Sequence, residues 1–115
     1  MKTKKELKEQ YRQQKFKMGV YQLRNTLNGK ILIGSSVNLD AIWNRLKTQL
    51  NFNTHQNAVL QADWQAAGES AFRFEILALE KEKDGESIDY SKEVKALELM
   101  YIDELQPFGD KGYHK

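Results

Sequence analysis

Glu98 is the polar side chain whose position most suggests chemistry. It falls on a helical stripe that is otherwise apolar and comprises Val94, Leu97, Tyr101 and Leu105. A carboxylate seldom occupies such a stripe without a cation or a hydrogen-bond donor beside it. The alternative is a glutamate at the edge of the stripe whose carboxylate reaches solvent. Both interpretations stay open from the residues alone.

Tyr21, His55 and Arg45 carry functional groups of types that take part in chemistry, although their own surroundings in the sequence assign them no role. A phenol and an imidazole exchange protons or donate hydrogen bonds, and a guanidinium steadies anionic oxygens. Each also has a simpler interpretation. Tyr21 lies in a predicted strand, where a tyrosine commonly packs its ring and exposes its hydroxyl. His55 lies in a polar stretch, where a histidine is as often an incidental surface residue.

The composition excludes several functional classes. The 115 residues contain no cysteine, which rules out a disulfide framework, a thiolate zinc site and a cysteine nucleophile. No apolar run approaches the about 20 residues that a membrane-spanning helix needs. Residues 1–5 lack the apolar segment of a secretion signal. These observations predict a folded domain in the cytoplasm with no membrane partner.

Positive charge is concentrated at the N-terminus. Residues 1–17 carry a formal charge of +5, whereas the whole chain carries +2. Residues 4–15 are good helix formers, so we predict a basic helix ahead of a domain at residues 18–115. Such a helix could bind DNA or RNA through phosphate contacts, although a short run of charge is usually only solvated.

Alternating apolar residues predict three strands. Residues 18–24 and 31–33 form the first two, and Asn28-Gly29 between them is typical of a type I′ hairpin turn. Residues 72–79 alternate in the same way and predict a third strand that is buried on much of both faces. The charged residues 81–89 are expected to form a solvated loop.

Helical spacing predicts three further helices. Residues 39–50 form the first, with Ser36 or Asn38 as N-cap, the second ends at Gly68, and the third ends before Pro107. The order of elements predicts an α+β fold in which a three-stranded, largely antiparallel sheet is flanked by helices, with the basic helix as an addition.

Gly19-Val20-Tyr21, ten further residues and Leu32-Ile33-Gly34 resemble the paired tripeptides of the GIY-YIG nuclease superfamily. The resemblance continues in order to residue 114 through these landmarks: Ser35-Ser36, Asn38, Trp43, Arg45, His55, residues 60–64, Gly68, Phe72, residues 74–77, Glu98 and Tyr101-Ile102. It implies the fold predicted above. It also implies one divalent metal held by a helix glutamate, two tyrosines that frame the attacking water and an arginine that steadies the phosphate.

The site that this resemblance implies is incomplete. Tyr21 matches the first tyrosine, His55 matches a frequent histidine, and Glu98 matches the metal ligand, which would hold Mg²⁺ weakly or not at all. An asparagine common near the C-terminus of the family falls at His114. The second tyrosine, the arginine and another histidine fall at apolar residues: Leu32, Ile42 and Leu46.

Phosphodiester cleavage needs cations or donors aimed at the phosphoryl oxygens, and apolar side chains supply neither. The resemblance and its losses predict a GIY-YIG-like domain that is inactive or severely impaired and keeps a nucleic-acid-binding role. One alternative is a metal-dependent endonuclease with a divergent site built from Tyr21, His55, Arg45 and Glu98. Another is a protein-interaction module whose apolar former cleft receives a partner. Nothing in the sequence sets the oligomeric state.

Overall fold

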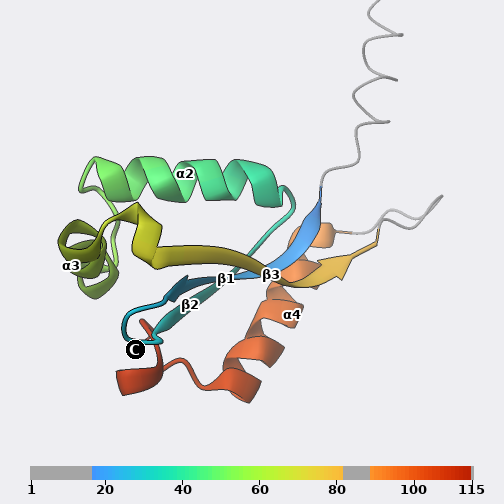
Figure 1. The fold of residues 1–115 in the computed structure, drawn as a ribbon. Helices are drawn as coiled ribbons and strands as arrows, with labels where there is room; N and C mark the ends of the chain where they lie inside the picture. Colours follow the sequence, from blue (N-terminus) through green and yellow to red (C-terminus); the bar gives the residue numbers. More distant parts are fainter. Residues whose placement is uncertain (1–16, 82–88, 115) are drawn as a thin grey trace, which may run out of the picture.

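The computed structural model describes residues 17–81 and 89–114 of the chain (Figure 1). The predicted basic N-terminal helix lies outside these residues, apart from Lys17, and so does most of the predicted loop at 81–89. The division of the chain into a helix at 1–17 and a domain at 18–115 therefore stays a prediction.

A three-stranded antiparallel sheet forms the centre of the fold. Its strands are β1 (Met18–Asn25), β2 (Ile31–Ser36) and β3 (Phe72–Glu80), in the order β2-β1-β3. The middle strand buries Val20 and Leu23 completely. The predicted α+β fold with a three-stranded antiparallel sheet is confirmed.

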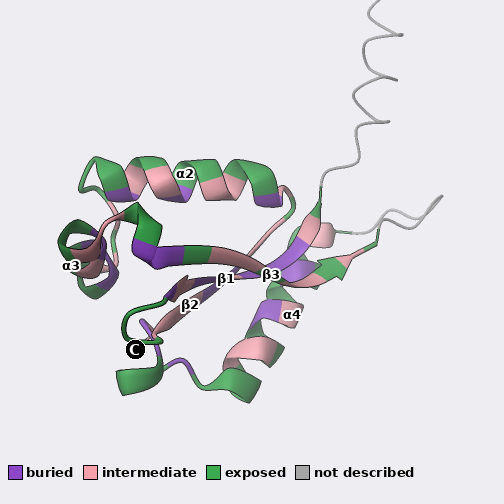
Figure 2. Cartoon of the chain, viewed as in Figure 1, coloured by how far each residue is buried: buried purple, intermediate pink, exposed green. Residues whose placement is uncertain are grey.

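Helices cover both faces of this sheet. Helix α2 (Leu39–Asn51) lies over one face and α4 (Tyr90–Leu105) lies against the other, where it contacts mainly β2 and β1 (Figure 1). Helix α3 (Ala58–Ala67) packs beside α2 at one end of the sheet. Figure 2 shows the buried residues on the strands and on the helix sides that face them. Within the described ranges, no helix is long and apolar enough to cross a membrane.

Side-chain caps determine where the first two of these helices begin. The Asn38 side chain accepts a hydrogen bond from the Ala41 N–H at 3.1 Å, which confirms Asn38 as the N-cap of α2. Asn57 caps α3 in the same way through the Leu60 N–H at 3.1 Å. Gly68, with φ of 83°, ends α3 as predicted.

The hairpin between β1 and β2 is confirmed, but the predicted type I′ turn is wrong. Residues 26–30 connect the strands, and the Gly29 N–H donates to the Asn25 carbonyl at 2.8 Å. Gly29 has φ of 77°, but Asn28 has no positive φ, whereas type I′ requires positive φ at both central residues. The Asn28 side chain instead accepts a hydrogen bond from the Lys30 N–H at 2.9 Å, which stabilises a longer loop.

Strand β3 is less buried than the sequence predicted. Ile76 is 42% exposed and Leu79 is 57% exposed. β3 is an edge strand, and the helices contact β1 and β2 more than they contact β3. A register shift between Val20 and Tyr21 also leaves Leu77 without a partner on β1, which interrupts the alternation of side chains between the two faces. The prediction of burial on both faces was therefore wrong.

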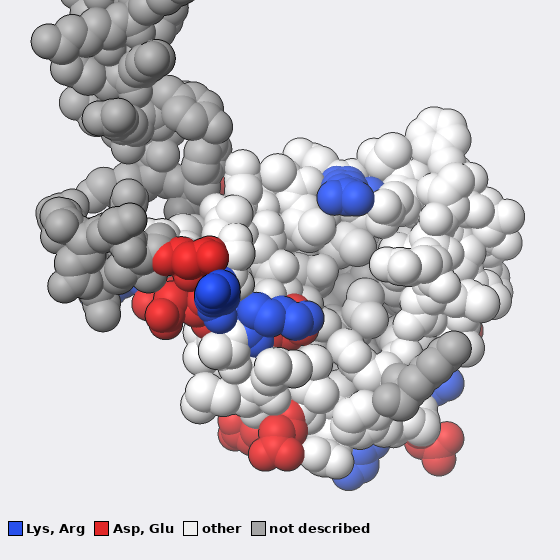
Figure 3. All heavy atoms as spheres, turned by 180° about the vertical axis from the view of Figure 1, so that it is seen from behind, with Lys and Arg blue, Asp and Glu red and all other residues white. Residues whose placement is uncertain are grey.

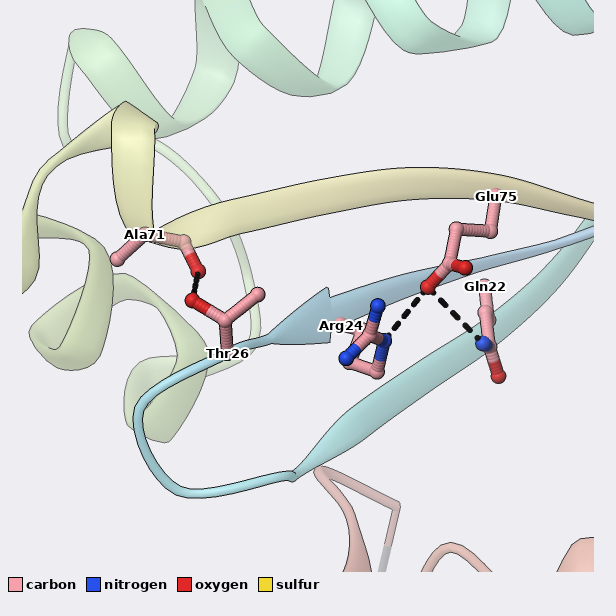
Figure 4. A network of polar contacts seen from close by, with 5 residues as sticks. All are labelled: Gln22, Arg24, Thr26, Ala71 and Glu75. Atoms are coloured by element: carbon pink, nitrogen blue, oxygen red, sulfur yellow. Dashed lines mark hydrogen bonds and ion pairs between the residues drawn. The ribbon is translucent and has the colours of Figure 1, made fainter.

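Polar side chains fasten β1 to β3 in Figure 4. The Arg24 Nε lies 2.6 Å from Glu75 Oε1, and the Gln22 amide donates to the same oxygen at 3.3 Å. The hydrogen bond from Arg24 holds the pKa of the Glu75 carboxyl below its usual value. Thr26 Oγ1 donates to the Ala71 carbonyl at 2.7 Å, so the hairpin is also tied to the residue before β3.

Candidate active site

A cavity of about 1010 Å³ opens where β2, α2, α4 and the C-terminal segment meet. The side of the molecule turned away from the viewer in Figure 1 is hollowed, and mostly uncharged residues surround the hollow (Figure 3). The cavity is lined by all the candidate site residues and by the positions where the family's polar groups are replaced: Tyr21, Leu32, Ile42, Arg45, Leu46, His55, Glu98 and His114. The fold therefore gathers residues from β1, β2, α2, the loop before α3, α4 and the C-terminal segment at one place.

Tyr21 is held firmly by its neighbours but keeps a free hydroxyl. It pairs with Gly34 across the hairpin, and its ring stacks on Phe74 at a centroid distance of 5.1 Å. A Cβ at Gly34 would overlap the Tyr21 ring, which explains the glycine of the second tripeptide. Burial, with the nearby Glu98 charge, raises the pKa of Tyr21 to about 12. The hydroxyl is therefore neutral at pH 7 and makes no hydrogen bond within the described chain, so it can bond a ligand.

Glu98 is buried, which rules out the interpretation of a glutamate that reaches solvent. It is 7% exposed. Its Oε1 accepts a hydrogen bond from Ser35 Oγ at 2.8 Å, and its Oε2 lies 2.6 Å from the ammonium of Lys95, one helical turn earlier on α4. Both carboxylate oxygens are thus engaged by donors of the chain itself.

The two histidines at the cavity each have one ring nitrogen occupied. His55 Nδ1 accepts from the Asn57 N–H at 3.0 Å, and His114 Nε2 accepts from the Ile33 N–H at 2.9 Å. Burial lowers the pKa of both imidazoles below the ordinary 6.5, so both are neutral at pH 7. From this hydrogen bonding, the proton is assigned to the other nitrogen of each ring. Each ring therefore offers an N–H donor and no free lone pair, so neither histidine is placed to act as a general base.

Three apolar side chains form one wall of the cavity. Leu46 is 5% exposed and belongs to a cluster with Tyr21 and Leu39, against which the half-buried Ile42 packs. The half-buried Leu32 faces the same cavity from β2. The positions that the family resemblance assigns to a tyrosine, an arginine and a histidine thus converge in space and offer no polar group.

Three basic side chains line the cavity: Lys30, Arg45 and Lys95. Arg45 lines it and makes no hydrogen bond or ion pair with any described residue. Lys30 also lines it, with its ammonium 5.9 Å from the ring centroid of Tyr113. Lys95 is the third and is paired with Glu98. The wall is therefore apolar, whereas basic side chains approach from several elements.

The C-terminal segment builds part of this site, although the sequence analysis singled out only His114 in it. Tyr113 is 4% exposed, and its hydroxyl donates to Asp63 at 2.7 Å and accepts from the Asn25 amide at 3.1 Å. Burial raises the pKa of Tyr113 to about 12. The Tyr113 N–H donates to the Ile31 carbonyl at 3.0 Å, so the segment runs along β2 and brings His114 to the cavity. The match of His114 to a family asparagine pointed to this segment, whereas the role of Tyr113 was not predicted.

The residues present do not fit a resident divalent metal. Among residues 17–81 and 89–114, no three histidine, aspartate or glutamate side chains gather into a possible metal site. Glu98 is a single carboxylate whose Oε2 already faces an ammonium at 2.6 Å. Mg²⁺ usually binds one or two carboxylates and completes its octahedron with waters and phosphate oxygens, so an ion at Glu98 would first have to displace Lys95 or Ser35 from the carboxylate.

Comparison with known proteins identifies relatives of this chain. No family model matches it. The chain is 32% identical over 78 residues to intron-associated endonuclease 1 of Enterobacteria phage T4, a match that covers 68% of this chain and 28% of the relative. The chain thus spans less than a third of that protein.

Two solved structures of the catalytic domain of I-TevI, an intron homing endonuclease, share the fold. One, a mutant form, has a TM-score of 0.66 and 26% identity, covering 79% of this chain and 86% of that one. The other has a TM-score of 0.65 and 29% identity, covering 84% and 95%. The fold of this chain is thus that of an endonuclease catalytic domain. This chain belongs to the GIY-YIG nuclease superfamily, as the paired tripeptides predicted.

Proposed function

We propose that this domain binds nucleic acid at the cavity and that its phosphodiester cleavage is absent or severely impaired. The observation that carries the proposal is the apolar wall of Leu32, Ile42 and Leu46 beside Tyr21 and Glu98. Cleavage adds negative charge to the phosphoryl oxygens, and this wall cannot stabilise that charge. Loss of one such donor typically slows catalysis about 100- to 1000-fold, and here three positions lack one.

Binding needs less than cleavage, because it requires only donors and positive charge. Tyr21 offers a free hydroxyl, His55 an N–H, and Arg45 a guanidinium with no partner in the described chain. Lys30 adds a further charge at the same cavity. We favour DNA as the first ligand to test because the relatives are named endonucleases. We propose the basic segment at residues 1–17 as a second, sequence-tolerant contact.

Cleavage of DNA by this protein should be undetectable. We expect the purified protein to show no cleavage of supercoiled plasmid or single-stranded DNA with Mg²⁺ or Mn²⁺ above the level of a Glu98→Gln variant. Gel electrophoresis over a time course measures this. Glu93→Gln is the matched control, since Glu93 is exposed on the same helix and does not line the cavity. Cleavage that Glu98→Gln abolishes and Glu93→Gln leaves intact would falsify the proposed loss of activity.

The basic N-terminal residues should contribute to DNA binding. Deletion of residues 1–16 should weaken binding to a labelled DNA duplex and flatten its salt dependence, because each phosphate contact contributes a slope of about −0.9 in log K against log salt. Fluorescence anisotropy across a salt series measures both quantities. An unchanged affinity and slope would show that this segment is only a solvated extension of the domain.

A second candidate function is a metal-dependent endonuclease with a divergent site. One observation favours it: Tyr21, His55, Arg45 and Glu98 line the same cavity. Against it stand the occupied lone pairs of both histidines and the Lys95 ammonium on Glu98. The Glu98→Gln comparison above separates this candidate from a binding domain.

A further inference from the structure

We propose that Lys95 takes the place of a divalent metal at Glu98 and anchors a nucleic-acid phosphate directly, so that binding needs no metal ion. The inference rests on the proposed function, because it names the group that holds the phosphate in the same cavity. Lys95 is not among the residues that carry the family resemblance.

The geometry gives Lys95 two neighbours at once. Its ammonium lies 2.6 Å from Glu98 Oε2, and both residues line the cavity. The Glu98 side chain is 9% exposed, whereas the Lys95 side chain is 62% exposed. An ammonium carries three N–H donors, so one can serve Glu98 while the others face the open cavity.

The charge of Glu98 makes this pairing necessary for binding. A buried carboxylate without a counter-ion would repel an incoming phosphate, and Ser35, its other partner, is uncharged. Lys95 cancels that negative charge and leaves donors for a charge-assisted hydrogen bond to a phosphate oxygen. Both carboxylate oxygens of Glu98 are already engaged, Oε2 by Lys95 and Oε1 by Ser35, so a divalent cation could reach Glu98 only by displacing one of these donors.

The first experiment tests the exclusion of metal and uses no nucleic acid. Thermal melts of the native protein and of Glu98→Gln are recorded with and without MnCl₂. If Lys95 holds the place of a metal, Mn²⁺ should raise the Tm of both proteins by the same small amount, less than about 1 °C. A Tm rise in the native protein that Glu98→Gln removes would overturn the inference, even if DNA binding were intact.

The second experiment tests the phosphate anchor. Anisotropy of a labelled DNA duplex is measured in EDTA and in Mg²⁺ at equal ionic strength, and the native protein should bind equally well in both. Lys95→Met should weaken binding in EDTA by about three- to tenfold, as expected for one charge-assisted hydrogen bond. Lys92→Met is the matched control, because Lys92 is exposed on the same helix and does not line the cavity.

A double variant separates the anchor from a folding defect. In Lys95→Met the buried Glu98 charge is left without its cation, so Lys95→Met/Glu98→Gln should recover part of the lost affinity. A need for Mg²⁺, or equal effects of Lys95→Met and Lys92→Met, would overturn the anchor while nucleic-acid binding itself stands. If the native protein binds no duplex in either buffer, the proposed function fails together with the anchor, and the Mn²⁺ melts still decide whether Lys95 excludes metal.

Discussion

The triple variant Leu32→Tyr, Ile42→Arg and Leu46→His is expected to melt well below the native protein and to regain part of that loss when phosphate is added. Each change reinstates the group that the family resemblance assigns to its position. All three positions line one cavity with Tyr21 and Glu98. The substitution therefore tests whether the apolar wall is what separates this domain from a nuclease.

The three substitutions should lower the free energy of unfolding by different amounts. Leu46 is 5% exposed in a cluster with Tyr21 and Leu39, so a histidine there loses apolar packing and buries a polar ring. Such a change costs about 2–5 kcal/mol. Leu32 and Ile42 are half-buried at the cavity, and a tyrosine or arginine there can extend into it. The double variant without Leu46→His should therefore be the more stable of the two.

Phosphate should rescue the triple variant because Glu98, the carboxylate at the cavity, is already paired with Lys95 and leaves a new arginine in the apolar wall without a free partner. A ligand that binds only the folded state adds about 2.7 kcal/mol at 100 times its Kd. Thermal melts with inorganic phosphate or an oligonucleotide, beside a plasmid-nicking assay with Mn²⁺, measure the rescue and any gained cleavage. A triple variant that melts like the native protein and gains no affinity for phosphate would show that these positions do not act on one ligand.

Gly19→Ala should destabilise the domain by about 3 kcal/mol or more, because overpacking that nearby atoms cannot relieve is costly. A Cβ at Gly19 would overlap the backbone carbonyl oxygen of Ala78 on β3. A backbone oxygen in a paired strand cannot turn aside as a side chain can, so β1 and β3 would have to separate. The register shift beside Val20 lies at the same point, close to the start of the first tripeptide.

Gly29→Ala is the matched control for Gly19→Ala. Gly29 has φ of 77° and open space around its would-be Cβ, so alanine there meets conformational strain alone, about 1–2 kcal/mol. Urea unfolding followed by circular dichroism measures both variants. Equal losses of unfolding free energy would mean that the contact with Ala78 does not explain the glycine of the first tripeptide.

Local patterns in the sequence were enough to predict most of the fold. The helix at residues 39–51, its Asn38 cap, the end of α3 at Gly68 and the β1–β2 hairpin all follow from periodicity and from the conformations that asparagine and glycine favour. The predicted turn type was wrong because the loop between β1 and β2 is longer than two residues. The predicted burial of β3 was wrong because β3 lies at the sheet edge, and that position depends on the strand order.

The sequence by itself determined which residues could matter. Tyr21 and Glu98 stood out because one lies in a tripeptide and the other interrupts an apolar stripe, and both features are local. The family resemblance likewise predicted that Leu32, Ile42 and Leu46 stand where relatives have polar groups. What no local pattern could show was that these positions share one cavity, because their meeting depends on contacts between distant segments.

Only the tertiary structure decided how the site is arranged. It buries Glu98 and pairs it with Lys95, engages one nitrogen of each histidine, and seats Tyr113 and His114 along β2. A single helix turn brings Lys95 near Glu98, but the burial that makes their pairing matter comes from packing of α4 against the sheet. Charge compensation of this kind depends on which surfaces lose water, and a chain acquires that property only when it folds.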